Sequence, residues 1–322
     1  MKNEFYPLQF TPILKERIWG GTKLGGELNK ELSSEITGES WEISTVKNEI
    51  SIVANGKFAG RNLNELIDDF PEEILGTEVV KRFGKEFPLL FKFIDAREDL
   101  SIQVHPNDEL AKKRHNSFGK TEMWYVMQAD PGSRIIVGFK EKSSPEEYLG
   151  HLENKSLVEI LDAVPAKSGD VFFLETGTVH AIGAGILLAE IQQTSDITYR
   201  VYDWDRVDAE GNSRELHIEQ ALDAINYDVI DTYRSYSDLP NMVNQVVDCP
   251  YFTTGFLPLD GKTEVTKSGA SFTVYMCVEG DFEIQSAGES FHYKKGDTVL
   301  LPAALQEYTL AGVGSLLEIS IS

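Results

Sequence analysis

Short strand-like segments follow one another closely through the middle of the chain, and this spacing most constrains how the chain folds. Between residues 87 and 204 the segments are rich in β-branched and aromatic residues and are separated by Gly, Pro, Asn and Asp. They occupy residues 87–96, 100–105, 121–129, 133–139, 169–175, 185–193 and 196–204. Runs of this kind between turn signals are typical of antiparallel strands. The pattern therefore predicts an antiparallel sandwich or a small barrel of the jelly-roll kind.

A few segments instead have the apolar spacing of helices. Residues 62–70 begin with an Asn, residues 144–164 open with Ser-Pro, and residues 213–225 repeat apolar residues at helical steps. Asn and Ser are common residues at helix starts, and Pro is tolerated in the first turn. We therefore predict a mainly β protein with a few short helices.

A faint internal repeat divides the chain. The stretch "KSGDVFFLETGTVHAI" begins at residue 167, and "KKGDTVLLPAALQEYTL" begins at residue 294. In both, a Gly-Asp pair predicts a turn and the apolar run after it predicts a buried strand. His180 lies near the end of the first copy, whereas Glu307 takes the corresponding place in the second. We therefore predict two related β domains, residues 1–235 and 236–322, of which only the first carries chemistry.

The charge of the chain limits its partners. Lys and Arg number 30 and Asp and Glu number 52, which gives a formal net charge of -22. So acidic a chain is a poor candidate for binding nucleic acid or an anionic membrane surface. Two cysteines, Cys249 and Cys277, are too few for a disulfide framework. The start "MKNEFYPLQF" lacks the apolar core of a signal peptide, so we expect a cytoplasmic protein.

Polar residues capable of binding a metal lie at the ends of several predicted strands. Gln103 and His105 stand two positions apart in "QVHPND", just before a Pro, and Glu122 follows Lys120 by two positions in "GKTEMWYV". Side chains two apart on a strand share a face, and inward-facing residues of neighbouring strands converge. His180, in "GTVHAIG", adds a second imidazole. Imidazole nitrogen and carboxylate oxygen suit Zn²⁺, and oxygen-rich sets also suit other divalent metals.

Each of these residues also has an ordinary structural interpretation. A His beside a Pro is usual in a turn, a Glu is usual at a strand edge, and a buried His is usual where it is hydrogen-bonded. The residues alone are therefore compatible with two interpretations, a metal site and a set of unrelated structural residues.

The motifs "QVHPND", "GKTEMWYV", "GTVHAIGAG" and "SDITYRVYDW" in this order resemble those of the type I mannose-6-phosphate isomerases in their short bacterial form. The resemblance is close over residues 10–206 and looser beyond. It implies two cupin-type jelly-roll domains, the C-terminal one degenerate, and one Zn²⁺ per chain. Carried over residue by residue, it implies that Gln103, His105, Glu122 and His180 bind the metal.

The same resemblance implies an activity. Mannose 6-phosphate and fructose 6-phosphate would be interconverted through a cis-enediol, which requires an acid/base group and stabilisation of negative charge. Lys120 is expected to donate to a substrate oxygen. Arg200 is expected to bind phosphate or stabilise the enediolate, although an ion pair with Asp203 or Glu190 is its ordinary structural interpretation. The base stays open between Asp196, Glu190 and a metal-bound water, with Asp196 favoured.

Two other functions compete with this one. A non-catalytic paralogue could use the same fold to sense sugar phosphates, but such a sensor needs no proton-transfer residues such as Lys120 and Arg200. A cupin oxygenase would use iron, but iron sites of that kind more often contain several His and one Glu. The Gln and only two usable His here disfavour it.

Overall fold

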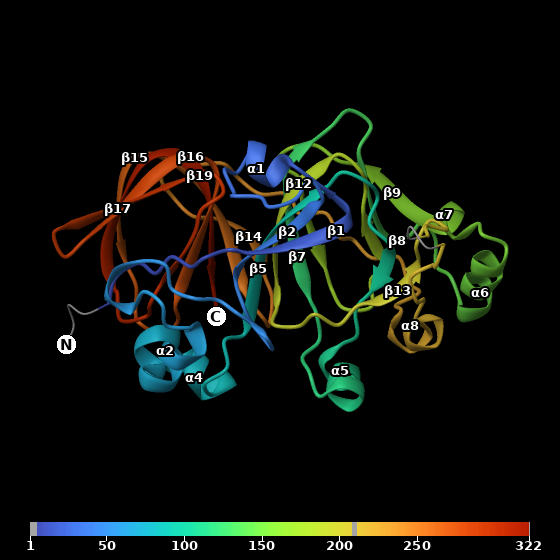
Figure 1. Ribbon diagram of the computed structural model, residues 1–322, viewed down its shortest axis with the longest axis horizontal. Helices are drawn as coiled ribbons and strands as arrows, with labels where there is room; N and C mark the ends of the chain where they lie inside the picture. The colour runs from blue at the N-terminus through green and yellow to red at the C-terminus, as the bar shows by residue number, and fades with distance from the viewer. Residues whose placement is uncertain (1–4, 208–210, 322) are drawn as a thin grey trace.

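A computed structural model describes residues 5–207 and 211–321, and in these residues the chain forms three large antiparallel sheets (Figure 1). In spatial order the first sheet contains β1 (Ile13–Gly21), β2 (Thr37–Ile43), β5 (Leu89–Ala96), β12 (Ile186–Gln193), β7 (Glu122–Ala129) and β10 (Val171–Leu174). The second contains β13 (Tyr199–Tyr202), β6 (Ile102–Val104), β11 (His180–Ile182), β8 (Arg134–Phe139) and β9 (Leu161–Pro165).

The third sheet lies in the C-terminal part of the chain. Its order is β14 (Asn244–Asp248), β15 (Thr253–Thr266), β19 (Glu307–Ser320), β16 (Thr273–Ser286) and β17 (Glu289–Lys294), with β18 (Thr298–Leu301) also paired to β16. A short hairpin joins β3 (Thr45–Val46) to β4 (Glu49–Ile50). Leu8, in the N-terminal segment, exchanges two backbone hydrogen bonds with Leu300 and so ties that segment to the C-terminal part.

The helices are short and lie outside the sheets (Figure 1). They are α1 (Lys23–Gly26), α2 (Leu63–Asp69), α3 (Pro71–Leu75), α4 (Thr77–Phe83), α5 (Asp108–His115), α6 (Pro145–Glu153), α7 (Leu157–Ile160) and α8 (Ile218–Ala224), with a 3-10 helix at Gly56–Phe58. Among the described residues, none of these helices is long and apolar enough to cross a membrane. The cytoplasmic location stays a prediction.

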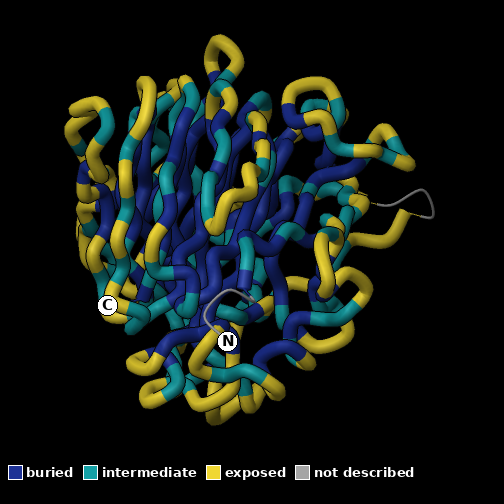
Figure 2. The backbone as a smooth tube through the Cα atoms, turned by 90° about the vertical axis from the view of Figure 1, so that its left-hand side faces the viewer, coloured by how far each residue is buried: buried dark blue, intermediate teal, exposed yellow. Residues whose placement is uncertain are grey.

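The first sheet is the central layer of the molecule. One of its faces packs on the second sheet through a core that includes Trp124, Ile186 and Leu188. The opposite face packs toward the C-terminal part through Phe91 and Phe252. Every residue of β5 and β12 is buried for this reason, and Figure 2 shows buried strands inside a margin of exposed turns. The predicted mainly β fold with few helices is confirmed, in its sandwich form.

Three predicted elements differ from the structure. The helix expected over residues 213–225 is confined to α8, Ile218–Ala224. The helix expected over residues 144–164 is divided, because α6 ends near Asn154 and Lys155 takes a left-handed φ of 55°. The chain then forms α7 and the strand β9. The strand expected over residues 196–204 is confined to β13, so Asp196 lies in an irregular segment before it.

The predicted repeat is visible in the backbone. Gly169 donates its N–H to the Val126 carbonyl and the Val126 N–H donates to the Asp170 carbonyl, both at 2.9 Å. In the C-terminal part, Gly296 and Asp297 form the same two bonds with Cys277, also at 2.9 Å. Both Gly-Asp pairs therefore make the same turn between corresponding strands.

The boundary between residues 235 and 236 stays a prediction. The segment just before it adds to the edge of the first sheet, because Phe173 donates its N–H to the Thr232 carbonyl and Arg234 donates to Val171.

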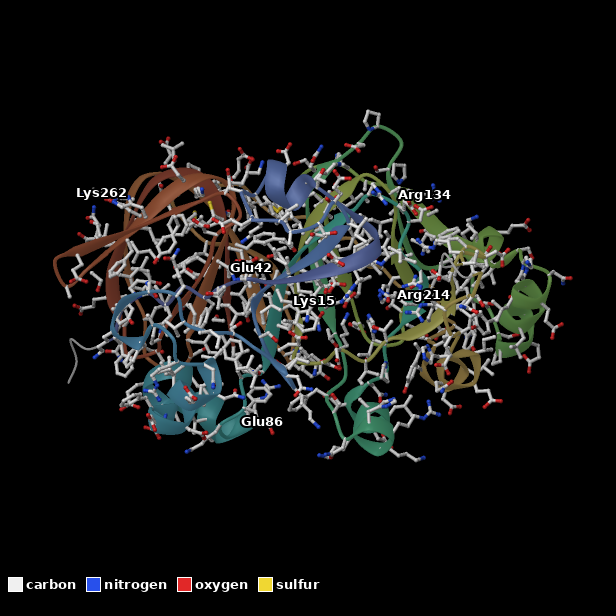
Figure 3. All side chains as sticks on the ribbon, viewed as in Figure 1. Lys15, Glu42, Glu86, Arg134, Arg214 and Lys262 are labelled. Carbon is white, nitrogen blue, oxygen red and sulfur yellow. The ribbon has the colours of Figure 1, made fainter. Side chains whose placement is uncertain are left out.

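The two parts of the chain also meet through a buried ion pair. Lys30 Nζ lies 2.8 Å from Glu42 and 2.7 Å from the Gly296 carbonyl. Figure 3 shows Glu42 on the side of the first sheet that faces the third. The Gly296 turn is therefore part of the contact between the two parts.

Gly296→Ala is expected to lower the free energy of unfolding more than Gly169→Ala. Both glycines have a φ near +90°, so each substitution should cost about 1–3 kcal/mol in backbone strain. A Cβ at position 296 would in addition lie 2.7 Å from Leu28 Cβ, whereas at position 169 the nearest atom is Tyr236 Oη at 3.5 Å. Urea unfolding of the two variants measures the difference. Equal losses would contradict the role assigned to the Leu28 contact.

Candidate metal centre and its cavity

Three side chains converge between the first and second sheets. Donor atoms of His105, Glu122 and His180 all lie within 4.8 Å of one another. His180 Nε2 is 3.3 Å from Glu122 Oε1, and His105 Nε2 is 3.5 Å from Glu122 Oε2. All three residues are buried, with relative exposures of 1% or less. The structure therefore brings together two imidazoles and one carboxylate away from bulk water.

Strand ends place these residues. Glu122 opens β7 in the first sheet, and His180 opens β11 in the second. His105 follows directly after β6, where Pro106 stops the strand. Because β11 and β6 pair in the second sheet, the two imidazoles approach the carboxylate from the same side.

Backbone carbonyls orient both imidazoles. His105 Nδ1 lies 2.9 Å from the Ile197 carbonyl, and His180 Nδ1 lies 2.8 Å from the Thr178 carbonyl. A carbonyl can only accept, so each Nδ1 carries the hydrogen and each Nε2 keeps its lone pair toward Glu122. Burial lowers the pKa of both rings, and Lys120 lowers it further, to about 3 for His180. Both rings are thus neutral at pH 7 and held in the form that binds metals.

Glu122 is the anion at the centre of the site. Burial raises the pKa of its carboxyl to about 7 despite the opposing charge of Lys120. Lys120 donates to Glu122, and its Nζ also lies 3.0 Å from His105 Nε2. Glu122 Oε1 and His180 Nε2 have no hydrogen-bond partner among the described residues. Unpaired polar atoms are rare at such depth, and this donor set fits a divalent cation such as Zn²⁺.

Gln103 lies beside this group on the same sheet. It stands directly opposite His180 across the β6–β11 pair and opposite Arg200 across the β6–β13 pair. Residues opposite each other in a sheet project to the same face. Gln103 is half-buried and lines the adjoining cavity. Its place as a fourth ligand stays a prediction.

A cavity of about 370 Å³ opens beside the three residues. Of the residues predicted from the sequence, it is lined by Gln103, Lys120, Glu190, Asp196 and Arg200. It is also lined by residues that the sequence did not place in a site, among them Arg17, Trp19, Glu39, Trp41, Lys92 and Arg214. Figure 3 shows Arg214 on the side of the second sheet.

The two candidate bases have different surroundings. Glu190 Oε1 lies 2.8 Å from Lys92 Nζ, and Glu190 Oε2 accepts from Trp124 Nε1 at 2.7 Å. Burial acts to raise the pKa of Glu190, but Lys92 and Lys120 lower it to about 2. Asp196 is exposed, and it lines both this cavity and a neighbouring one of about 730 Å³. Asp196 is therefore the freer of the two carboxylates.

Arg200 is held toward the cavity by its neighbours. Its Nη1 donates to the Glu215 carbonyl at 2.8 Å, and its Nε has no partner among the described residues. Asp203, one of the ion-pair partners considered for Arg200, instead accepts hydrogen bonds from Arg206 and Arg214. Glu190, the second ion-pair partner considered for Arg200, instead pairs with Lys92.

Family models match both parts of the chain. A model for the catalytic domain of type I phosphomannose isomerase matches residues 8–130. A model for the cupin domain of mannose-6-phosphate isomerase matches residues 242–321.

Curated relatives match nearly the whole chain. The mannose-6-phosphate isomerase ManA of Bacillus subtilis is 39% identical over 312 residues, which cover 95% of this chain and 96% of that protein. A mannose-6-phosphate isomerase of Streptococcus mutans is 36% identical over 310 residues, with 95% of each chain covered.

Solved structures have the same fold. The crystal structure of the mannose 6-phosphate isomerase from Bacillus subtilis superposes with a TM-score of 0.89 at 35% identity, covering 97% of this chain and 99% of that one. A variant of phosphomannose isomerase from Salmonella typhimurium superposes with a TM-score of 0.79 at 16% identity, covering 98% and 99%. At that identity the second match shows the fold alone.

The affinity of the site for Co²⁺, used as a probe cation, is expected to fall as the pH is lowered through about 7. The proton on Glu122, whose pKa is raised to about 7, must leave before the carboxylate can bind a cation. His180 stays neutral in this range because its pKa is about 3. Dissociation constants from Co²⁺ absorption on either side of neutral pH measure the effect.

Glu122→Gln should weaken binding and remove this pH dependence. Glu307→Gln, a change at an exposed residue of β19, should keep both the affinity and its pH dependence. A wild-type affinity that stays constant through neutral pH would contradict the assignment.

Proposed function

The chain belongs to the type I phosphomannose isomerase family, and from this membership we propose that it is a metal-dependent enzyme that interconverts mannose 6-phosphate and fructose 6-phosphate. The observation that carries the proposal is the convergence of His105, Glu122 and His180 behind Lys120, which lines the neighbouring cavity together with other cations. Lys120, Arg200 and Asp196 all line that cavity. Lys120 and Asp196 are groups that can exchange protons, which supports catalysis over a sensing role.

We assign His105, Glu122, His180 and Gln103 as the residues that hold the metal, one Zn²⁺ per chain. When bound, a divalent cation supplies positive charge that stabilises negative charge developing on substrate oxygens. The neutral imidazoles and the single carboxylate leave part of that charge uncompensated. The carbonyls of Ile197 and Thr178 fix the imidazole orientations that this role needs.

A local excess of cations explains how an acidic chain binds an anionic substrate. The cavity is lined by Arg17, Lys92, Lys120, Arg200 and Arg214, which outnumber its carboxylates. Guanidinium groups bind phosphate oxygens in pairs. Arg200 is half-buried and its Nε is free of partners among the described residues, so it is our candidate for the phosphate.

The isomerisation moves two protons on the substrate. In the direction from mannose 6-phosphate, a base removes the C2 proton and returns it to C1 of a cis-enediol, while a hydroxyl proton leaves O2 and another is gained at O1. We assign the carbon-bound proton to Asp196. Glu190 is the weaker candidate because Lys92 and Trp124 hold it as a low-pKa anion. Lys120 donates a hydrogen bond to the substrate oxygen that gains negative charge.

Purified protein is expected to form fructose 6-phosphate from mannose 6-phosphate in a coupled assay, to lose this activity to a chelator, and to regain it with Zn²⁺. His105→Ala should abolish both bound metal and activity, because it removes one donor and leaves Glu122 buried with fewer partners. His292→Ala is the matched control, since His292 is an exposed imidazole in the C-terminal part. Full activity in His105→Ala would overturn the ligand set.

Asp196→Asn is expected to lower kcat by about 10²–10⁴-fold with little change in KM, as for loss of a general base. Asp260→Asn, at an exposed position of β15, is the control and should leave kcat unchanged. Initial-rate measurements on both variants make the comparison. A kcat close to that of the wild type in Asp196→Asn would assign the proton transfer to another group.

A further inference from the structure

We propose that Gln192 is a positioning residue of the metal centre, which joins Lys92 to the turn at residues 193–197 and through that turn orients His105. The inference rests on the proposed function, because it takes His105 to be a metal ligand.

Gln192 is fully buried in β12, where it stands opposite Glu122 of β7. Its Oε1 accepts a hydrogen bond from Lys92 Nζ at 2.6 Å. Its Nε2 donates to the Gln193 carbonyl at 2.9 Å and to the Ser195 carbonyl at 2.6 Å. Lys ammonium can only donate and carbonyls can only accept, so the chemistry of the partners fixes which way the amide faces.

The side of the amide that faces Lys92 is firmly anchored. Lys92 Nζ is also held by Glu190 at 2.8 Å, and Glu190 in turn accepts from Trp124 at 2.7 Å. These residues are buried in the central sheet. The position of Gln192 Oε1 is therefore set by the sheet and not by the turn.

The other side of the amide holds a segment without regular structure. In the turn, Ser195 donates its N–H to the Gln193 carbonyl at 2.7 Å, and the Ile197 N–H donates to Ser195 Oγ at 3.3 Å. The Ile197 carbonyl then accepts from His105 Nδ1 at 2.9 Å. One path of hydrogen bonds thus leads from the central sheet through Gln192 to the imidazole.

The same turn carries Asp196. Its neighbours Ser195 and Ile197 are fixed on either side, so the carboxylate is presented to the cavity by the segment that Gln192 holds. A change at Gln192 should therefore affect metal affinity and turnover together. A residue needed only for packing would lower stability without changing the coordination of a bound metal.

Gln192→Met tests the proposal, because it keeps most of the side-chain volume and removes all three hydrogen bonds. We expect the dissociation constant for Co²⁺ to rise about 10- to 100-fold, as for loss of other outer-shell partners. The d–d absorption bands of the bound Co²⁺, which report coordination geometry, should also shift. Gln245→Met, at an exposed position of β14, is the control and should match the wild type in both measurements.

The outcomes separate this inference from the proposed function. Weaker binding with shifted bands in Gln192→Met supports it, and wild-type affinity and bands in a folded Gln192→Met overturn it while leaving the metal site intact. Failure of the wild type to bind Co²⁺ overturns the metal site and the inference with it. If Gln192→Met does not fold, Gln192→Asn, which withdraws the same amide by one methylene, is judged by the same two measurements.

Discussion

The burial of Glu122 between two neutral imidazoles is the constraint on which the rest of the site depends. An isolated carboxylate is very costly to bury and must be paired or neutralised. Here burial raises its pKa to about 7, and Lys120 is the cation that opposes this rise. A bound divalent cation would satisfy the same carboxylate and the Nε2 of His180, which has no hydrogen-bond partner among the described residues. The Glu122 carboxylate is positioned by the strand ends and by the imidazoles, which backbone carbonyls orient. The nearby lysines offset its negative charge.

Side chains on both faces of β12 form hydrogen bonds that hold the segments next to Glu122 in place. On the cavity side, Gln192 fixes the turn that carries Asp196. On the opposite side, Gln193 accepts from the Thr121 N–H at 2.9 Å and donates to Asp108 at 3.0 Å. Tyr251, from the C-terminal part, donates its hydroxyl to the same Asp108 at 3.0 Å. The C-terminal part thus reaches the segment between Lys120 and Glu122 through two intervening side chains.

The sequence predicted the parts of the site that depend on strand alternation and on the resemblance. His105, Glu122 and His180 lie together as expected because each stands at the end of a regular strand. Arg17 and Trp19 also stand two apart, in a strand-like stretch before Gly20. Their place in the cavity depends on pairing between β1 and β2, which alternation within one segment does not reveal.

Other features depend on tertiary structure that local patterns do not encode. Arg214 lines the cavity from a segment without regular structure, although the sequence predicted a helix over residues 213–225. The last residues of the helix expected over residues 144–164 instead form β9, whose pairing with β8 outweighs helical spacing there. The Gln192 contacts were not predicted because a Gln in an apolar strand has no distinctive sequence signal.

Comparison of the two repeated units separates the framework of the site from its chemistry. The shared Gly-Asp turns align Val126 with Cys277, and therefore Trp124 with Tyr275 and Glu122 with Thr273. Glu190 stands opposite Trp124, and Glu318 stands opposite Tyr275.

The contacts of these two carboxylates correspond as well. Tyr275 donates to Glu318 at 2.6 Å, and Lys267 pairs with Glu318 at 2.7 Å, as Trp124 and Lys92 do with Glu190. An aromatic donor, a carboxylate and a lysine thus occur in both units, although Thr273 stands in the second unit where Glu122 stands in the first. The network around Glu190 is therefore a property of the fold. This is an independent reason to leave Glu190 out of the proposed proton transfer.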